Sequence, residues 1–134
     1  MKDPRYGRNS ELVGEDPFLT GSYAAAYGNA MQVLKSGKNG LGKKMYQKML
    51  SYVKHYTAYS VEASRFTFSN NVTQFDFWDS FLPQYEMAFV GPGHTDGAMC
   101  SYFAPNGVSM CGNPALLNGM LRSEKVDDYA TGVV

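Results

Sequence analysis

A lysine followed by a histidine, Lys54-His55, is the pair of side chains in this sequence best suited to holding a polar ligand. The pair ends an apolar segment of strand length, where one side chain can point toward a ligand while the other supports it. An ammonium donates hydrogen bonds and an imidazole donates or accepts them, so the pair suits a ligand rich in hydroxyl groups. A surface lysine beside a half-buried histidine is the structural alternative, and it is the commoner reading of an isolated Lys-His pair.

Arg8 is a third cationic side chain that could contact a ligand. It lies in the segment DPRYGR, where Gly7 permits close approach of the backbone. Acidic residues downstream could pair with the two arginines of this segment, which would make it a structural loop clamp. These acidic residues are Glu11, Glu15 and Asp16.

Two cysteines, Cys100 and Cys111, lie on either side of a Pro-Asn-Gly turn at 105–107. The turn could bring them close enough for a disulfide, although the sequence alone leaves their pairing open. Together with His94 they do not supply the four ligands of a structural zinc site, and no histidine is spaced to form a catalytic dyad with either thiol. We therefore expect no metal site and no cofactor.

The triplet Asn71-Val72-Thr73 is a sequon for N-linked glycosylation. It has meaning only in a secreted protein, and such triplets often arise by chance. Residues 1–11 lack the apolar stretch of a signal peptide, so the sequence leaves the cellular compartment open.

Several aromatic residues could stack on a ligand ring, but aromatic residues at helical spacing usually belong to a core. For that reason we assign Trp78 to packing. The aromatic set comprises Tyr56, Tyr59, Trp78, Tyr102 and Phe103.

Glycine and proline residues divide the chain into short elements that must position these side chains. Apolar residues recurring at three- and four-residue spacing predict two helices, the second of them bent at Pro83. A third helix is indicated by an asparagine that can cap it and a proline suited to its first position. The predicted helices are 20–35, capped by Thr20 or Ser22, 72–89, and one that begins at Asn113 and Pro114.

Three segments have strand length, 50–56, 98–102 and 130–134, although 43–53 could equally extend as an amphipathic helix. Strands that alternate with helices favour a single α/β domain with a parallel sheet and right-handed crossovers. In such folds ligands bind beyond the carboxyl ends of the strands. This rule directs attention to Lys54, His55 and Tyr102.

The charge composition of the chain bears on which classes of binding partner can be expected. The 134 residues include 12 Lys+Arg and 12 Asp+Glu, so the formal net charge is zero and provides no field to attract nucleic acid or an anionic membrane. No apolar run approaches the ~20 residues needed to span a bilayer. We therefore expect neither a nucleic-acid nor a membrane partner.

Five motifs in order resemble glycoside hydrolase family 3, and within it the β-xylosidase-like branch. The motifs are DPRYGRNSELVGEDPFLTGSYA, KHYTAYSVE, RFTFSNNVT, FWDSFLPQYEMAF and AMCSYFAPNGVSMCGNPALLNGMLRSE. The resemblance covers nearly the whole chain and is weakest at 36–49. It implies that residues 1–134 are part of the family's N-terminal (β/α)8 barrel, roughly its middle-to-late βα units, with no second domain.

The resemblance also implies which residues bind the substrate. The sugar at the non-reducing end would be held by side chains at the strand ends, with a tyrosine ring packed against it. These residues are Arg8, Lys54, His55, Met99 and Tyr102. Glu11, Glu15 and Asp16 match positions that order the loop presenting Arg8. The substrate would be a β-linked xyloside or glucoside, with α-arabinosides also open, and the parent family is commonly secreted.

The family mechanism is retaining: an aspartate attacks the anomeric carbon and a glutamate protonates the leaving group. By the resemblance, the nucleophile follows the strand ATGVV just beyond Val134, and the proton donor comes from a later segment or a second domain. We expect no catalytic carboxylate within the chain, and its partners would be the remainder of the parent barrel and the second domain. A complete barrel has about 250 residues, so about half would be present. We therefore expect a glycoside hydrolase by family whose 134 residues alone are inactive; the alternative is a non-catalytic sugar-binding remnant or an inactive gene fragment.

Overall fold

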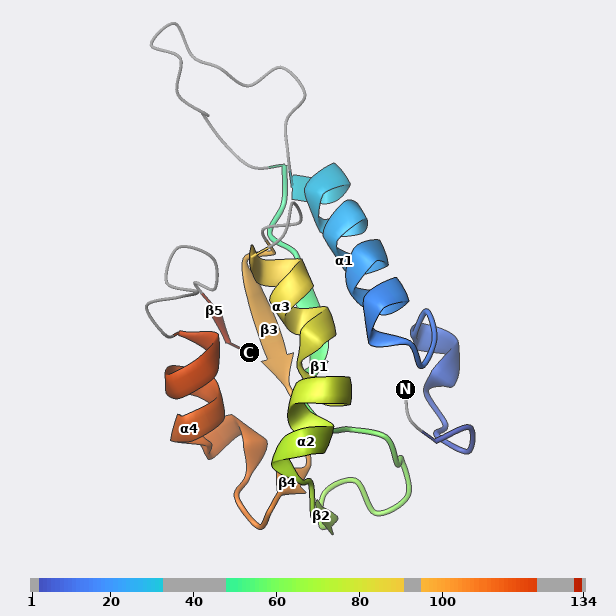
Figure 1. The fold of residues 1–134 in the computed structure, drawn as a ribbon, viewed down its shortest axis with the longest axis vertical. Helices are drawn as coiled ribbons and strands as arrows, with labels where there is room; N and C mark the ends of the chain where they lie inside the picture. The colour runs from blue at the N-terminus through green and yellow to red at the C-terminus, as the bar shows by residue number, and fades with distance from the viewer. Residues whose placement is uncertain (1–2, 33–47, 91–94, 123–131, 134) are drawn as a thin grey trace, which may run out of the picture.

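The computed structural model describes residues 3–32, 48–90, 95–122 and 132–133 (Figure 1). Its helices and strands alternate along the chain, as expected for an α/β fold. The helices are α1 (Pro17–Gln32), α2 (Gln74–Asp76), α3 (Pro83–Val90) and α4 (Pro114–Leu116), with 3-10 turns η1 (Asn9–Glu11) and η3 (Met110–Gly112) and π-helical turns η2 (Phe77–Phe81) and η4 (Leu117–Leu121). The strands are β1 (Tyr52–Tyr56), β2 (Ser69–Asn70), β3 (Gly97–Cys100), β4 (Ala104–Pro105) and β5 (Gly132–Val133).

Strands β1, β3 and β5 form a parallel sheet in that order. The central strand β3 pairs through Ala98 with Val53 on one side and Val133 on the other. Ala98 is fully buried, as expected for the middle of a sheet. The predicted parallel α/β arrangement is confirmed for the described residues. Residues 48–51 are not helical, so the helical alternative for 43–53 is wrong there; residues 43–47 lie outside the described residues.

A second pair of parallel strands, β2 and β4, joins Ser69 to Ala104 and Asn70 to Pro105. The sequence does not predict it, because two-residue strands carry no periodic signal. Near this end of the molecule, Tyr6, Tyr59 and Phe103 form a small aromatic core.

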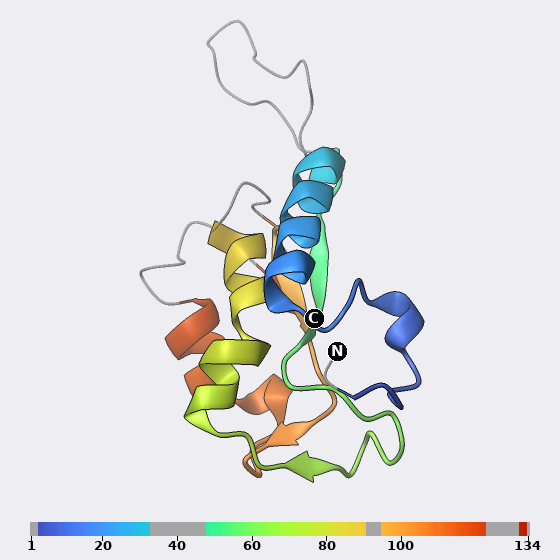
Figure 2. The same cartoon turned by 45° about the vertical axis from the view of Figure 1, so that its right-hand side comes forward.

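Helix α1 lies beside α3, and α3 packs against strand β1 (Figures 1 and 2). Gly21 makes this close packing possible, since a Cβ at that position would lie 2.7 Å from Met87 Sδ and 3.1 Å from Gln84 Cα. The main core lies between the sheet and the later helices. It contains Tyr56, Leu82, Tyr85, Phe89, Ala98, Met110, Leu116, Leu117 and Leu121.

Helix α1 begins three residues earlier than predicted. The Asp16 carboxylate accepts hydrogen bonds from the backbone N–H groups of Phe18 and Leu19, and Pro17 takes the first helical position. The predicted caps at Thr20 and Ser22 are therefore wrong; Asp-Pro was the stronger start signal. The predicted end, at 33–35, lies outside the described residues.

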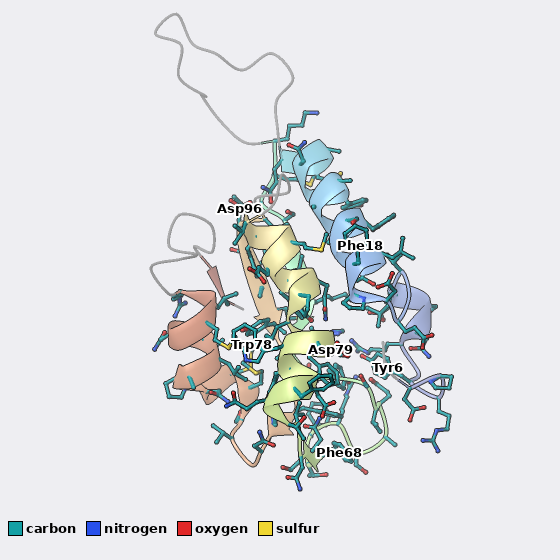
Figure 3. The ribbon with its side chains drawn as sticks, viewed as in Figure 1. Tyr6, Phe18, Phe68, Trp78, Asp79 and Asp96 are labelled. Carbon is teal, nitrogen blue, oxygen red and sulfur yellow. A yellow bond between two sulfur atoms is a disulfide. The ribbon has the colours of Figure 1, made fainter. Side chains whose placement is uncertain are left out.

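The segment predicted as one bent helix at 72–89 is three helical pieces. Thr73 and Asp76 form a capping box at its start, and the break falls at Leu82, before Pro83, as predicted. The π-helical turn η2 rotates the following residues relative to an α-helical stripe. Trp78 is 61% exposed, and Phe75, one turn before it, is 74% exposed, so the early part of the predicted stripe faces away from the core and the assignment of Trp78 to packing is wrong (Figure 3).

The third predicted helix is confirmed in position and in its cap. The side chain of Asn113 accepts a hydrogen bond from the backbone N–H of Leu116 at 3.1 Å, and Pro114 is the first helical residue. Leu116, Leu117 and Leu121 enter the main core. Among the helices in the described part of the chain, none is long and apolar enough to cross a membrane.

Candidate functional site

The sequence-predicted site residues gather where parallel strands β1 and β3 end. Lys54 of β1 is the register partner of Met99 of β3, and Tyr102 follows β3 by two residues. Lys54, Met99 and Tyr102 are all exposed, so this edge of the sheet presents their side chains to solvent. The location agrees with the rule that ligands bind beyond the carboxyl ends of parallel strands.

An irregularity in β1 lies within this cluster. Lys54 pairs with Met99 and Tyr56 with Cys100, so His55 is an extra residue in the ladder. Without this bulge, Lys54 and Tyr56 would face the same side of the sheet. The bulge allows Lys54 to stay exposed while Tyr56 is buried in the core and donates a hydrogen bond to the carbonyl of Leu116 at 3.0 Å.

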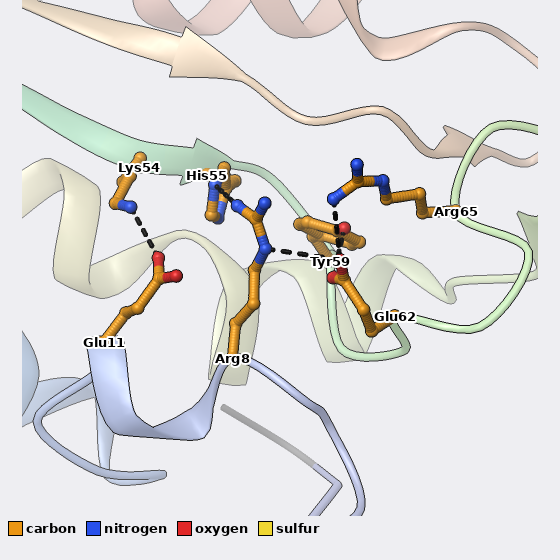
Figure 4. A network of polar contacts seen from close by, with 7 residues as sticks. All are labelled: Arg8, Glu11, Lys54, His55, Tyr59, Glu62 and Arg65. Carbon is orange, nitrogen blue, oxygen red and sulfur yellow. Dashed lines mark hydrogen bonds and ion pairs between the residues drawn. The ribbon is translucent and has the colours of Figure 1, made fainter.

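Arg8 reaches this strand end from the N-terminal segment (Figure 4). Its Nη1 lies 3.1 Å from Nε2 of His55. A guanidinium can only donate, so Nε2 accepts and the imidazole proton lies on Nδ1. Helix α3 fixes the same residue from the other side, because the Tyr85 hydroxyl donates to the His55 carbonyl at 2.6 Å.

Burial lowers the pKa of His55 to about 4, and the positive charges of Lys54 and Arg8 act in the same direction. The carboxylates of Glu11 and Glu62 oppose the shift, but less strongly. His55 is therefore neutral at pH 7. A neutral imidazole has one unprotonated nitrogen, so this state is consistent with Nε2 accepting the hydrogen bond from Arg8.

Glu62 is the centre of the polar network and was not predicted from the sequence. One carboxylate oxygen accepts from Arg8 Nε at 3.3 Å and from Arg65 Nη1 at 2.7 Å, and the other accepts from the Tyr59 hydroxyl at 2.5 Å (Figure 4). These donors, the Tyr59 bond first, lower the pKa of Glu62. Glu62 ends the motif KHYTAYSVE, but no spacing rule connects it to Arg8, 54 positions away.

Glu11 forms an ion pair with Lys54, with Oε2 2.5 Å from Nζ. The hydrogen bond from Lys54 lowers the pKa of Glu11. The expected pairing of the downstream acids with the two arginines is thus wrong: Arg8 pairs with Glu62, and Arg5 pairs with Asp3 at 2.7 Å. Glu11 lies on the 3-10 turn η1 and faces Lys54, and Asp16 accepts from the first backbone N–H groups of α1.

A pocket of about 260 Å³ opens beside β1, between that strand and helix α1. Lys54, His55 and Glu11 line it, together with Tyr23 and Tyr27 of α1. Arg8, Met99 and Tyr102 are not among its lining residues. The pocket therefore takes up only part of the predicted set, and the strand-end cluster is the more complete candidate site.

Among the predicted aromatic residues only Tyr102 and Trp78 are exposed. Tyr56, Tyr59 and Phe103 are buried in the two cores. The Tyr59 ring contacts His55 edge-on at 5.0 Å and Tyr102 at 6.4 Å between centroids, so it connects the two strand ends.

Cys100 and Cys111 form a disulfide whose Cα atoms are 5.3 Å apart. Asn71 is exposed, in the loop between β2 and α2. Within the described residues no group of three or more His, Cys, Asp or Glu side chains could hold a metal ion. His94 and the strand segment 130–131 lie outside the described residues.

Chemically, the strand-end cluster is a set of hydrogen-bond donors held by carboxylates. An ammonium, a guanidinium and a neutral imidazole converge, and an exposed tyrosine ring lies beside them. Such a set suits a neutral ligand with many hydroxyl groups. The two carboxylates in the network are ionised and engaged, so they serve to hold the donors in place.

Known proteins resemble this chain over nearly its full length, although no family model matches it. β-D-Xylosidase 3 of Arabidopsis thaliana is 39% identical over 129 residues, covering 92% of this chain and 16% of that protein. β-Xylosidase/α-L-arabinofuranosidase 2 of Medicago sativa subsp. varia is 38% identical over 134 residues, covering 96% of this chain and 16% of that protein. The chain thus spans only about one sixth of the length of these curated relatives.

Solved structures that resemble this chain come from the same kinds of enzyme. A glycoside hydrolase family 3 exo-β-xylosidase in complex with a xylobiose aziridine probe is 28% identical with a TM-score of 0.79, covering 94% of this chain and 16% of that one. β-Glucosidase 3B of Thermotoga neapolitana in complex with glucose is 25% identical with a TM-score of 0.80, covering 99% of this chain and 16% of that one. The chain is therefore a partial glycoside hydrolase family 3 sequence, similar to β-xylosidases and β-glucosidases.

Proposed function

We propose that the protein carrying these residues is a retaining, exo-acting glycoside hydrolase that removes a sugar, xylose in the first place, from the non-reducing end of a β-linked glycoside. The βα units described here would then be part of a (β/α)8 barrel. The names of the relatives support the substrate class, and the parallel strands with a donor cluster at their carboxyl ends support the fold and the site. Secretion and a second domain are proposed on the family resemblance alone.

The observation that carries this proposal is the convergence of Arg8, Lys54 and His55 from two distant segments onto one strand end. In the proposed complex, the ammonium and guanidinium donate to sugar hydroxyls while the Nδ1–H of His55 provides another donor. Met99 and Tyr102, at the end of the neighbouring strand, would pack against the sugar ring. Glu11 and Glu62 hold the cations in place before the sugar binds, which reduces the entropic cost of binding.

The bond-making groups are proposed to lie outside the described residues. A general acid needs a carboxyl whose pKa is raised, and a retaining enzyme needs a second carboxylate free to attack. Glu11 and Glu62, the carboxylates of the network, have lowered pKa values; Glu11 accepts from Lys54, and Glu62 accepts from Arg8, Arg65 and the Tyr59 hydroxyl. Their environment suits a binding role and neither catalytic role.

The test is hydrolysis of an aryl β-xyloside and binding of xylose by the whole protein and by its Lys54→Ala variant. The proposal expects hydrolysis with retention of configuration, and a rise of the KM of roughly tenfold or more for the variant. Xylose binding that depends on Lys54, without hydrolysis, would instead support the second candidate, a non-catalytic sugar-binding protein. That candidate is favoured by the engagement of both network carboxylates. If the protein neither binds nor hydrolyses any pentoside or hexoside, both candidate functions are refuted.

A further inference from the structure

Arg8, Lys54 and His55 form the donor cluster proposed to bind the terminal sugar. Next to it, two aromatic rings and a guanidinium form a second surface, of which only one ring was assigned to that sugar. We call Arg65, Phe66 and Tyr102 the aromatic platform. The rings of Phe66 and Tyr102 meet edge to face with centroids 4.8 Å apart. The guanidinium carbon of Arg65 lies 4.8 Å from the Phe66 centroid and 5.3 Å from the Tyr102 centroid.

The platform differs from the core aromatics beside it in its exposure. Phe66 is 69% exposed and Tyr102 is 51% exposed, whereas Phe103, next in sequence to Tyr102, is 1% exposed. Leaving two large rings in water forgoes the stabilisation that their burial would bring. The rings therefore form an apolar surface open to a ligand, in a segment whose other aromatic side chains are packed.

The platform is held rigidly against the donor cluster. Arg65 donates to Glu62 at 2.7 Å, and the same carboxylate oxygen accepts from Arg8. From the other side, Tyr102 contacts Tyr59, whose ring contacts His55. These two chains of contacts, joined by the hydrogen bond from Tyr59 to Glu62, fix the platform relative to the residues assigned to the terminal sugar.

We propose that the aromatic platform binds the second sugar ring of a β-linked oligosaccharide, on the leaving-group side of the scissile bond. A pyranose ring presents an apolar C–H face that stacks on an aromatic ring and a rim of hydroxyls that accept from a guanidinium. Arg65 supplies the donors and Phe66 the stacking surface, while Tyr102 borders both sugars. This inference rests on the proposed function, because it needs the first ring to occupy the donor cluster.

The test measures hydrolysis by the whole protein of xylobiose and of methyl β-xyloside, which lacks a second ring. Phe66→Ala should lower kcat/KM for xylobiose roughly tenfold while leaving methyl β-xyloside within about twofold, since one stacked ring is lost. Phe66→Trp keeps a ring and should keep the xylobiose rate. Phe75→Ala removes another exposed ring, 74% exposed on α2, and serves as the matched control. Equal effects of Phe66→Ala on both substrates would overturn the inference.

Binding separates a failure of this inference from a failure of the proposed function. Titration with a non-hydrolysable thio-linked xylobiose and with xylose should show a preference for the disaccharide that Phe66→Ala abolishes. If the wild-type protein hydrolyses neither substrate yet shows this preference, the proposed function fails and the platform stands. If the wild-type protein binds both sugars equally, or neither, the platform is refuted.

Discussion

Arg8 donates a hydrogen bond to Nε2 of His55 across 3.1 Å, although the two residues are 47 positions apart in the chain. The contact joins the N-terminal segment to the end of β1 and sets the tautomer of the imidazole. It also leaves the Nδ1–H as the proton that His55 can offer to a ligand. Burial and the positive charge of Arg8 both lower the pKa of His55. The ring is therefore neutral, and a neutral ring is what the hydrogen bond from Arg8 to Nε2 requires.

The first prediction is the titration of His55. Its pKa should be about 4, mainly because burial disfavours the charged ring and secondarily because Lys54 and Arg8 are cationic. Nitrogen-15 NMR of the imidazole should show Nδ1 protonated and Nε2 bare at pH 7. The sequence contains two histidines, so a His94→Gln background leaves a single imidazole from this chain to follow.

The same shift fixes the sign of its contribution to stability. The unfolded chain binds a proton near pH 6.5 and the folded chain near pH 4, so the free energy of unfolding falls as the pH is lowered between these values. Glu11 and Glu62 act in the same direction at lower pH, because their folded pKa values are lowered. A His55 midpoint at or above 6.5, or stability that rises on acidification from pH 6.5 to 4.5, would contradict the burial and the Arg8 contact.

The second prediction concerns Glu62, which contacts Arg8, Arg65 and the Tyr59 hydroxyl at once. Replacing it with glutamine removes the charge that holds both guanidiniums while keeping similar size. The pairs are partly exposed, so we expect a moderate effect, a rise in KM for an aryl β-xyloside of about fivefold with kcat changed less.

The control is Glu86→Gln, an exposed acid on α3. Glu62→Asp should recover part of the loss, since it restores the charge at a shorter reach. If kcat falls and KM stays constant in Glu62→Gln, the residue acts on the reaction itself and not by positioning the binding side chains.

Local patterns predicted the elements well where a single strong signal controls them. Asn113 and Pro114 marked a helix start, Pro83 marked a break, and the strand segments fell within about two residues of their observed bounds. Capping and proline effects depend only on neighbours along the chain, so a sequence can be read for them. The parallel order of the strands followed from their alternation with helices.

The errors came from interactions that are not local. Trp78 is exposed because only the later part of its apolar stripe, Leu82, Tyr85 and Phe89, packs in the core, and the spacing of apolar residues does not tell which part finds a packing partner. Arg8 pairs with Glu62 and not with the acidic residues close to it in sequence, because the fold places the loop after β1, which carries Glu62, beside Arg8. Arg8, Lys54, His55 and Tyr102 were candidates from residue type and position, and Met99 was added by the resemblance, whereas Glu62, Arg65 and Phe66 emerged only from the three-dimensional contacts.

The third prediction concerns the disulfide that joins Cys100, the last residue of β3, to Cys111. Closing a loop with a sequence separation of 11 limits the unfolded chain, and replacing both cysteines with serine should cost about 3 kcal/mol of unfolding free energy. Chemical denaturation of the wild-type and double-serine proteins, each with and without a reducing agent, measures it.

Reducing agent should shift only the wild-type protein, because the double-serine variant has no bond to lose. The sequence contains two cysteines, so alkylation before and after reduction gives an independent reading. Free thiols in the unreduced native protein, or an equal shift in both variants, would show that the bond does not form or does not stabilise the fold.

The last prediction concerns Asn106, which holds the loop before α2 to the turn inside the disulfide. Its side chain accepts from the Val72 backbone N–H at 2.8 Å and donates to the Val72 carbonyl at 2.9 Å. Its backbone has a φ of 54°, a left-handed conformation that asparagine tolerates better than most residues. Asn106→Ala removes both bonds and adds backbone strain, so it should cost about 2 kcal/mol. Asn106→Gly removes only the bonds and should cost about half as much. Equal losses in the two variants by chemical denaturation would show that the backbone conformation contributes nothing, and a loss in neither would show that the Val72 bonds are replaced by water.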